Sequence, residues 1–267
     1  MHLKRWITAL VCVPVLIYVI GPGPRWVFYL LLCLVSMIGL NEFLRLTMSH
    51  TPVIIRWAGY ALSLMMFGVI YLRGVYLIPV VIVLMAYVPL IIMVLTCTSP
   101  ERRLTGELGK LLFASVYISV PLGMLMIIDR YPRGNIWIFF LLSVTFACDT
   151  GAYYMGKLLG RHKLHKVVSP GKTWEGAIGG VLAGFIIAFL FLRISGHSKV
   201  GFSMFVLVLC MSIAGQLGDL GESMLKRNHG VKDSGHILPG HGGLLDRIDA
   251  LLFSIPILYI YLSIFVA

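Results

Sequence analysis

Residues 75–97 read VYLIPVVIVLMAYVPLIIMVLTC, a run in which no side chain is charged. About 20 consecutive apolar residues in a helix match the hydrocarbon thickness of a bilayer. The same character recurs in the runs 6–22, 25–46, 56–73, 110–129, 135–156, 174–195, 200–221 and 246–266. The sequence therefore predicts an all-α polytopic membrane protein with about nine transmembrane helices.

The overall composition supports this class. Of the 267 residues, 59% are hydrophobic and 12% are charged, which excludes an ordinary soluble domain. The five cysteines lie in or beside apolar runs and form no CxxC pair, so we expect buried small side chains and neither disulfides nor a zinc site. Gly21–Pro24 is a turn, so we expect the first run to be retained as a helix rather than cleaved as a signal peptide.

The distribution of charge predicts an orientation. If the N-terminus is cytoplasmic, most of the 22 Lys and Arg residues fall on the cytoplasmic side. Most of the 11 acids lie in the second half of the chain. We therefore expect a single integral membrane domain over 1–267, with scaffold helices in 1–134 and catalytic helices and cytoplasmic loops in 135–267.

The helix predicted at 200–221 ends in a polar face. Asp219, Glu222, Ser223 and Lys226 follow at i, i+3, i+4 and i+7, so they share one side of a helix. A solvated helix end with a Glu222–Lys226 pair is the simpler interpretation. It does not account for Asp219, which lies close to an apolar run and needs a cation. We therefore expect Asp219 to be a metal ligand.

Two more acids open the last predicted helix. Asp246 and Asp249 lie at i and i+3, where they would also complement the helix dipole. Carboxylates from two helices that converge on one point can bind a divalent metal, and Mg²⁺ takes one or two carboxylates plus substrate phosphates. The glycine-rich stretch 228–244 before them could bind phosphate through backbone N–H groups. His241 within it could bind phosphate, act as an acid or brace the loop.

The loop 156–176 is rich in cations. Ser169–Thr173 is expected to form a compact turn before a helix N-terminus, which favours anion binding by Lys166, Ser169 and Lys172. Plain positive charge on the cytoplasmic side is the alternative for the other cations of this loop.

Two features flank this loop. Gly176, Gly180 and Gly184 form a GxxxGxxxG stripe, which is typical of close helix packing in lipid. Asp149 lies inside an apolar helix and should meet a cation or a polar substrate group.

The last third of the chain resembles a known family. The pattern is Ser223-x-x-Lys226-Arg227-x4-Lys232-Asp233, Leu238-Pro239-Gly240-His241-Gly242-Gly243 and Asp246-Arg247-Ile248-Asp249. It is similar to the signature of phosphatidate cytidylyltransferases, also called CDP-diacylglycerol synthases. Asp219 and the segment Ser169–Thr173 with Glu175 resemble that family as well.

The resemblance implies a nucleotidyltransferase of phospholipid biosynthesis. Its substrates would be CTP and phosphatidate, and its products CDP-diacylglycerol and pyrophosphate. It also implies Mg²⁺ held by Asp219 and Asp246, a bacterial inner membrane with the catalytic loops facing the cytoplasm, and a homodimer. No nucleic acid is expected as a partner, whereas membrane lipids are.

The candidate site residues fall into three groups. The expected catalytic residues are Asp219, Asp246, Asp249, Lys226 and Arg227. Binding of CTP and lipid phosphates is expected from Lys166, Ser169, Lys172, Ser223, Lys232, His241, Gly242, Gly243 and Arg247. Further polar residues of the site are Asp149, Glu175, Glu222 and Asp233.

Two other functions use similar residues. A CTP-dependent lipid kinase would share the acids and cations, but its alcohol nucleophile would need a general base such as Asp149 or His241. A lipid transporter would be expected to show inverted repeats and broken helices at the bilayer midplane, and the sequence shows neither.

Overall fold

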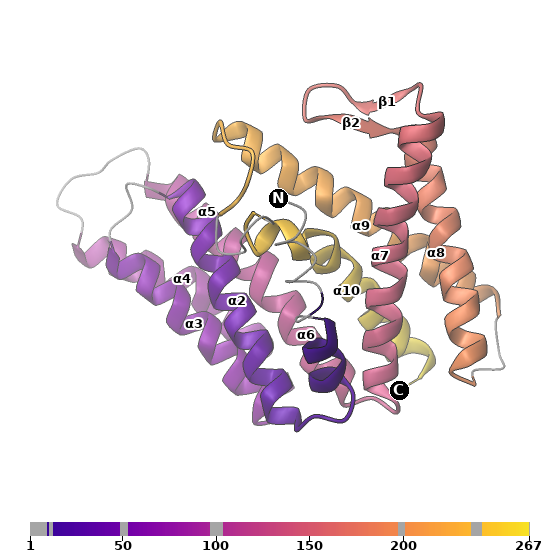
Figure 1. The fold of residues 1–267 in the computed structure, drawn as a ribbon. Coiled ribbons are helices and arrows are strands. Elements are labelled where there is room, and N and C mark those ends of the chain that lie inside the picture. The colour runs from indigo at the N-terminus through magenta and orange to yellow at the C-terminus, as the bar shows by residue number, and fades with distance from the viewer. Residues whose placement is uncertain are drawn as a thin grey trace. The chain divides into compact units, whose positions relative to one another are not determined.

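The computed structural model describes residues 10, 13–48, 53–96, 104–196, 201–235 and 242–266. Its elements are α2 (Arg25–Thr47), α3 (Val53–Tyr71), η1 (Val75–Leu77), α4 (Ile78–Thr96), α5 (Leu104–Ala114), η2 (Ser115–Ser119), α6 (Val120–Asp129), α7 (Gly134–Leu159), β1 (Lys163–His165), β2 (Ser169–Thr173), α8 (Trp174–Ile194), α9 (Phe202–Asn228) and α10 (Leu245–Phe265). Figure 1 labels the α-helices and the two strands. The prediction of an all-α polytopic membrane protein is confirmed.

Within the described residues, 8 helical segments are long and apolar enough to cross a membrane. They match the predicted runs from 25–46 onwards, and the span predicted at 110–129 is built from α5, η2 and α6 together. The run predicted at 6–22 lies partly outside the described residues, and its residues 13–20 are helical. Many large apolar side chains of α4, such as Val94 and Leu95, are exposed, as expected for a surface that faces lipid.

The chain forms two compact units, each described here by itself. The first contains Met1–Ile127 and Asp233–Leu245, and the second contains Ile128–Lys232 and Asp246–Ala267. In the first unit, α2 packs against α3 and α5. The hydroxyls of Ser36 in α2 and Ser119 in η2 are 3.0 Å apart and buried, so each polar group has a partner inside an apolar bundle. That the whole chain acts as one domain stays a prediction.

The second unit is organised around the close packing of α7 and α8. Gly176, Gly180 and Gly184 of α8 all face α7, which confirms the packing predicted from their spacing. A methyl group on Gly180 would lie 2.8 Å from the carbonyl oxygen of Cys148. Small residues therefore let the two backbones approach closely enough to hold the elements at their ends in a fixed arrangement.

A β-hairpin follows α7, where the sequence predicted a compact turn over Ser169–Thr173. That prediction was wrong, because these residues form β2, which pairs antiparallel with β1 in the register Lys163↔Thr173 and His165↔Ser169. The pair closes where Trp174 N donates to His162 O at 2.9 Å. Thr173 is extended and its Oγ1 accepts a hydrogen bond from Gly176 N at 3.1 Å, so the strand passes directly into the capped start of α8.

The close contact of Gly180 with α7 predicts how two glycine-to-alanine variants differ in stability. Gly180→Ala should lower the free energy of unfolding by about 1–3 kcal/mol, because the added methyl group meets rigid backbone. Gly221→Ala in α9 is the control, since a methyl group there would meet nothing within 4 Å. It should leave stability unchanged or raise it by about 1 kcal/mol through better helix propensity. Unfolding of both variants in detergent checks this, and an equal loss in the two would contradict it.

Candidate active site

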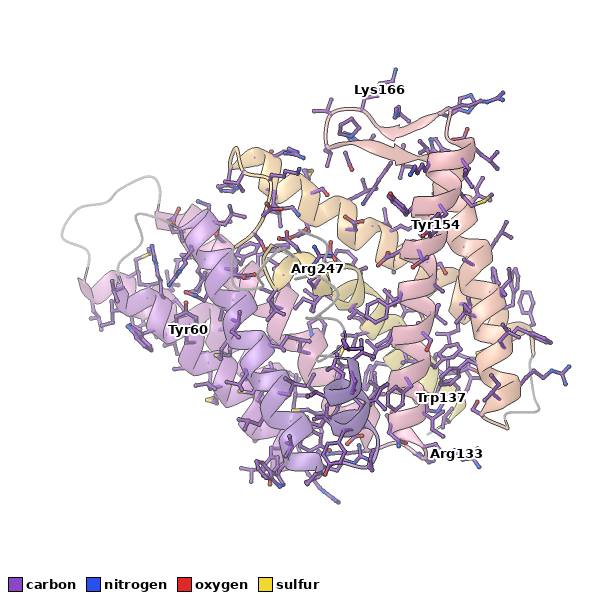
Figure 2. All side chains as sticks on the ribbon, in the orientation of Figure 1. Tyr60, Arg133, Trp137, Tyr154, Lys166 and Arg247 are labelled. Carbon is purple, nitrogen blue, oxygen red and sulfur yellow. The ribbon has the colours of Figure 1, made fainter. Side chains whose placement is uncertain are left out.

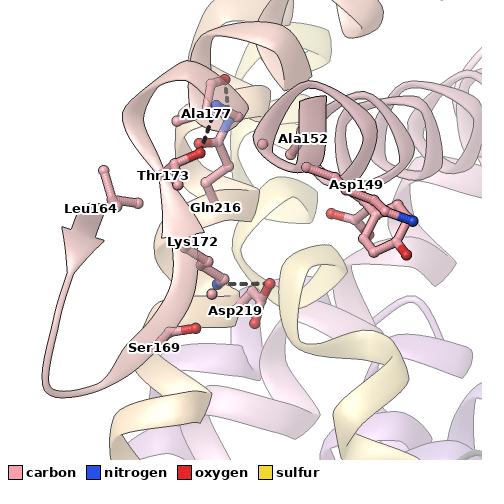
Figure 3. Close-up of a pocket in the computed structure, with 14 residues that line it drawn as sticks. Asp149, Ala152, Leu164, Ser169, Lys172, Thr173, Ala177, Gln216 and Asp219 are labelled. Carbon is pink, nitrogen blue, oxygen red and sulfur yellow. Dashed lines mark hydrogen bonds and ion pairs between the residues drawn. The ribbon is translucent and has the colours of Figure 1, made fainter. Parts of the chain in front are cut away.

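A pocket of about 530 Å³ lies beneath the hairpin in the second unit (Figure 3). It is lined by α7, β1, β2, α8 and α9, because the close α7–α8 contact brings the hairpin over the side of these helices. Its lining side chains include Asp149, Ser169, Lys172, Gln216 and Asp219. Four of these five were predicted as site residues from the sequence, and only Gln216 was not. The amide of Gln216 donates to Ala177 O at 3.1 Å and so ties α9 to α8 at the pocket wall.

An ion pair spans this pocket. Lys172 Nζ in β2 lies 2.7 Å from Asp219 Oδ2 in α9 (Figure 3). The side chain of Asp219 is 40% exposed, so its carboxylate can still be reached from the pocket. The sequence indicated that Asp219, close to an apolar run, needs a cation, and Lys172 is that cation. Strand β2 carries Lys172 to that position.

Two further acids lie near this ion pair. Asp149 in α7 and Asp249 in α10 both lie close enough to Asp219 for the charges to interact. Asp249 is 8% exposed, and its Oδ1 accepts a hydrogen bond from Ala250 N at 2.8 Å. Helices α9 and α10 meet closely at Gly218, where a methyl group would lie 2.6 Å from Asp249 O. This contact is what brings the acid of α10 toward the acid of α9.

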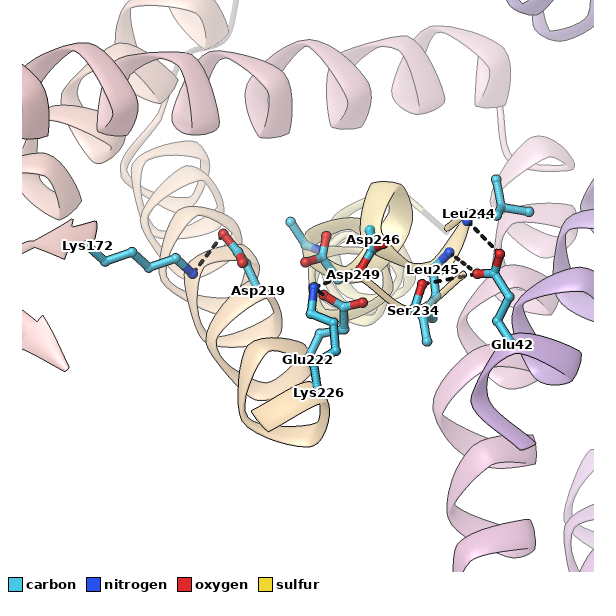
Figure 4. Close-up of polar contacts among 11 residues, drawn as sticks. Glu42, Lys172, Asp219, Glu222, Lys226, Ser234, Leu244, Leu245, Asp246 and Asp249 are labelled. Carbon is cyan, nitrogen blue, oxygen red and sulfur yellow. Dashed lines mark hydrogen bonds and ion pairs between the residues drawn. The ribbon is translucent and has the colours of Figure 1, made fainter. Parts of the chain in front are cut away.

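A second cluster centres on Lys226, whose Nζ lies 2.7 Å from Asp246 Oδ1 and 2.6 Å from Glu222 Oε2 (Figure 4). One ammonium group therefore faces two carboxylates. Glu222 is 2% exposed, and its Oε1 is buried without a hydrogen-bond partner among the described residues. Leaving a buried carboxylate incompletely matched is costly, so the cluster has the capacity to accept a further cation or a proton.

The oxygen atoms of these acids fit a hard divalent cation. Carboxylate oxygens are the ligands that Mg²⁺ prefers, and the orphaned Oε1 of Glu222 indicates unused capacity. Among the residues that the structure describes, no three His, Cys, Asp or Glu side chains form a ready-made metal cluster. The two expected ligands are instead paired with different lysines, Asp219 with Lys172 and Asp246 with Lys226. That arrangement suits a metal that arrives with substrate phosphates, since Mg²⁺ is usually bound in that way.

Not every predicted phosphate-binding residue lines the pocket. Lys166, at the loop of the hairpin (Figure 2), lines a separate surface hollow together with Arg161, His162, Lys163 and Trp174. Glu175 supports the base of the hairpin, because its carboxylate accepts hydrogen bonds from the backbone N–H groups of Arg161 and His162 and contacts His162 Nδ1 at 2.6 Å. The structure therefore separates Lys166 and Glu175 from Lys172.

The other predicted residues lie around the end of α9 and the start of α10. Ser223 is half-buried in α9, and the exposed residues are Arg227, Lys232, Asp233 and Arg247. Gly242 has a φ of 82°, which favours glycine, and Gly243 is buried. His241 lies outside the described residues, so its predicted roles stay open.

One residue of evident importance was missed by the sequence analysis. Glu42 lies in α2, is 3% exposed, and accepts hydrogen bonds from Leu244 N, Leu245 N and Ser234 Oγ at 3.0, 2.8 and 3.2 Å. Figure 4 shows these contacts. An acid inside an apolar helix is a functional candidate by default. That argument, which singled out Asp149, applied equally to Glu42.

Comparison with known proteins agrees with the resemblance. The family model described as "Cytidylyltransferase family" matches residues 3–265. Relatives named phosphatidate cytidylyltransferase occur in Bacillus subtilis (42% identical over 162 residues), Staphylococcus saprophyticus (38% over 167) and Staphylococcus haemolyticus (40% over 167). The matched segments cover 60 to 62% of this chain and 60 to 64% of those relatives, so the chain spans less than two thirds of their length. With the family model matching nearly the whole chain, this protein belongs to the cytidylyltransferase family.

Proposed function

We propose that this protein transfers the cytidylyl group of CTP to phosphatidate, giving CDP-diacylglycerol and pyrophosphate. The observation that carries the proposal is the pocket in which Lys172 pairs with Asp219 and which Asp149 also lines. Fixed cations and metal-binding acids side by side are what a reaction between two polyanions requires. Membership in the cytidylyltransferase family and the printed names of the relatives support the same choice of substrates.

The proposed reaction is an attack by one phosphate on another. An oxygen of the phosphatidate monoester forms a bond to the α-phosphorus of CTP. The bond from that phosphorus to the oxygen bridging to the β-phosphate breaks, and pyrophosphate leaves with the electron pair. The second pKa of a phosphate monoester is about 6, so the nucleophile is already ionised near neutral pH and needs no strong base.

The residues of the site then have separate tasks. Lys172 neutralises phosphate charge at the pocket, and Lys226 with Arg227, Lys232 and Arg247 does so near α10. Asp219 and Asp246, with Asp249, would hold one or two Mg²⁺ ions. When bound, Mg²⁺ would supply neutralisation of the triphosphate and of the leaving pyrophosphate.

The site also has to bring a lipid and a nucleotide together. Because one substrate is embedded in the bilayer and the other is dissolved in water, we propose that the reaction occurs at the cytoplasmic face of a bacterial inner membrane. The acids and cations at the ends of apolar helices support that placement. The homodimer implied by the family resemblance stays a prediction.

A product assay tests the function directly. Purified protein in detergent is given phosphatidate, labelled CTP and Mg²⁺, with and without EDTA. We expect a CDP-lipid and pyrophosphate, both abolished by EDTA. Formation of CDP with a newly phosphorylated lipid from an alcohol substrate would instead show a kinase. Absence of any metal-dependent turnover would overturn the proposal.

The ion pair in the pocket generates a second prediction. Lys172→Met and Asp219→Asn should each lower kcat by about 100-fold or more, because each removes a charge from a preorganised site. Lys163→Met is the matched control, since Lys163 is a hairpin lysine that does not line the pocket. It should retain activity. Initial rates for the three variants, with folding checked by gel filtration, decide the matter, and full activity in Asp219→Asn would contradict the assigned role.

A further inference from the structure

The described residues of the glycine-rich segment 233–245 contact the side chain of Glu42 in α2. The segment's described parts are 233–235 and 242–245, and both are held by the carboxylate of Glu42. Leu244 N donates to Oε1 at 3.0 Å and Leu245 N to Oε2 at 2.8 Å, while Ser234 Oγ donates to Oε2 at 3.2 Å. One buried carboxylate therefore joins the beginning of the segment to its end (Figure 4). Hydrogen bonds to a charged acceptor are stronger than those between neutral groups.

Two glycines of the segment explain how the carboxylate fits. A methyl group on Gly235 would lie 2.5 Å from Glu42 Oε1, and one on Gly243 would lie 2.7 Å from Oε2 and against Ser234 Oγ. Real side chains do not approach that closely, so with a larger residue at either position the segment and the carboxylate could not keep their present contact. Both glycines are thus required by close approach to Glu42.

The contact between Glu42 and Leu245 lies at the start of α10. Leu245 is the first residue of α10, and its N–H is one of the groups at a helix N-terminus that have no partner within the helix. An anion at this point is also favoured by the helix dipole. The next residue is Asp246, which contacts Lys226. The anchor therefore acts on the residue immediately before a proposed metal ligand.

We propose that Glu42 is a positioning residue, which fixes the described parts of the glycine-rich segment, 233–235 and 242–245, and hence the start of α10. It does so by binding three donors at the two ends of the segment. Glu42 itself takes no part in the chemistry. The structural part of the proposal stands on these contacts alone, and its kinetic part rests on the proposed function.

The first test replaces the carboxylate with an amide of the same size. In Glu42→Gln, the amide group turns a donor toward N–H groups, so the backbone amides of Leu244 and Leu245 should exchange with deuterium much faster than in the unchanged protein. At equal folded protein, kcat should fall by about 100-fold while the KM for CTP changes little, as expected for lost positioning. Glu107→Gln is the control, because Glu107 is an acid of the same unit that pairs with Lys110. It should alter neither measurement.

The outcomes separate the two proposals. Unchanged exchange at Leu244 and Leu245 in Glu42→Gln overturns the positioning role whatever the enzyme's activity. Faster exchange with kcat intact also overturns it, because Glu42 would then be a structural contact only. If the unchanged protein shows no cytidylyl transfer at all, the proposed function fails, and the exchange data still decide whether Glu42 holds the segment.

A second test uses a different variant, so that the proposal can be decided even where Glu42→Gln does not fold. Gly235→Ala keeps the carboxylate but should displace the segment from it, giving the same rise in exchange and fall in kcat. Gly109→Ala, where a methyl group meets nothing within 4 Å, should have no effect. Because the added methyl collides with Glu42, the double variant Glu42→Ala/Gly235→Ala should be no worse than Glu42→Ala alone. Fully additive losses would show that the glycine is not required by Glu42 and would contradict the proposal.

Discussion

Charge buried among apolar helices has to be matched, and that constraint organises the polar contacts of this protein. Burying a carboxylate without a partner costs several kcal/mol, more than leaving a neutral polar group unsatisfied. Asp219 is matched by Lys172, Glu222 and Asp246 share Lys226, and Glu42 is matched by donors that include two backbone N–H groups. Apart from the Glu222–Lys226 pair, which lies within α9, each pairing joins different elements of the chain, so neutralising the charges also shapes the site.

The pairings differ in how readily they can be exchanged for substrate. Asp219 is 40% exposed in the pocket, so phosphate or metal can compete for the Lys172–Asp219 pair. Glu42 is 3% exposed and bound to the backbone, which gives a fixed anchor instead of an exchangeable one. Lys226 lies between these cases, since it is largely buried and holds two acids at once. One chemical requirement thus produces both an accessible carboxylate, Asp219, and a buried one, Glu42.

Glycines also bring polar groups of separate elements together, because they allow close approach of the backbone. The stripe Gly176, Gly180 and Gly184 lets α8 approach α7 and so positions the hairpin that carries Lys172. Gly218 lets α9 approach α10, which brings Asp249 toward Asp219. Gly235 and Gly243 make room for the Glu42 carboxylate. In each place a missing side chain allows polar groups from separate elements to meet.

The sequence by itself determined the helices and the family to which the chain belongs. Apolar runs of membrane length predict spans without knowledge of packing, since the bilayer imposes their length locally. The acids and cations of the last third, and the stripe of small residues in 174–195, are also local patterns that can be read from the sequence alone. Only the tertiary structure decided which charges pair. Whether Lys166 or Lys172 reaches Asp219 depends on the β1–β2 register, and that register pairs residues on both sides of a turn. Whether Glu42 faces lipid or the segment 233–245 depends on contacts between residues about 200 positions apart in the chain, which no local pattern encodes.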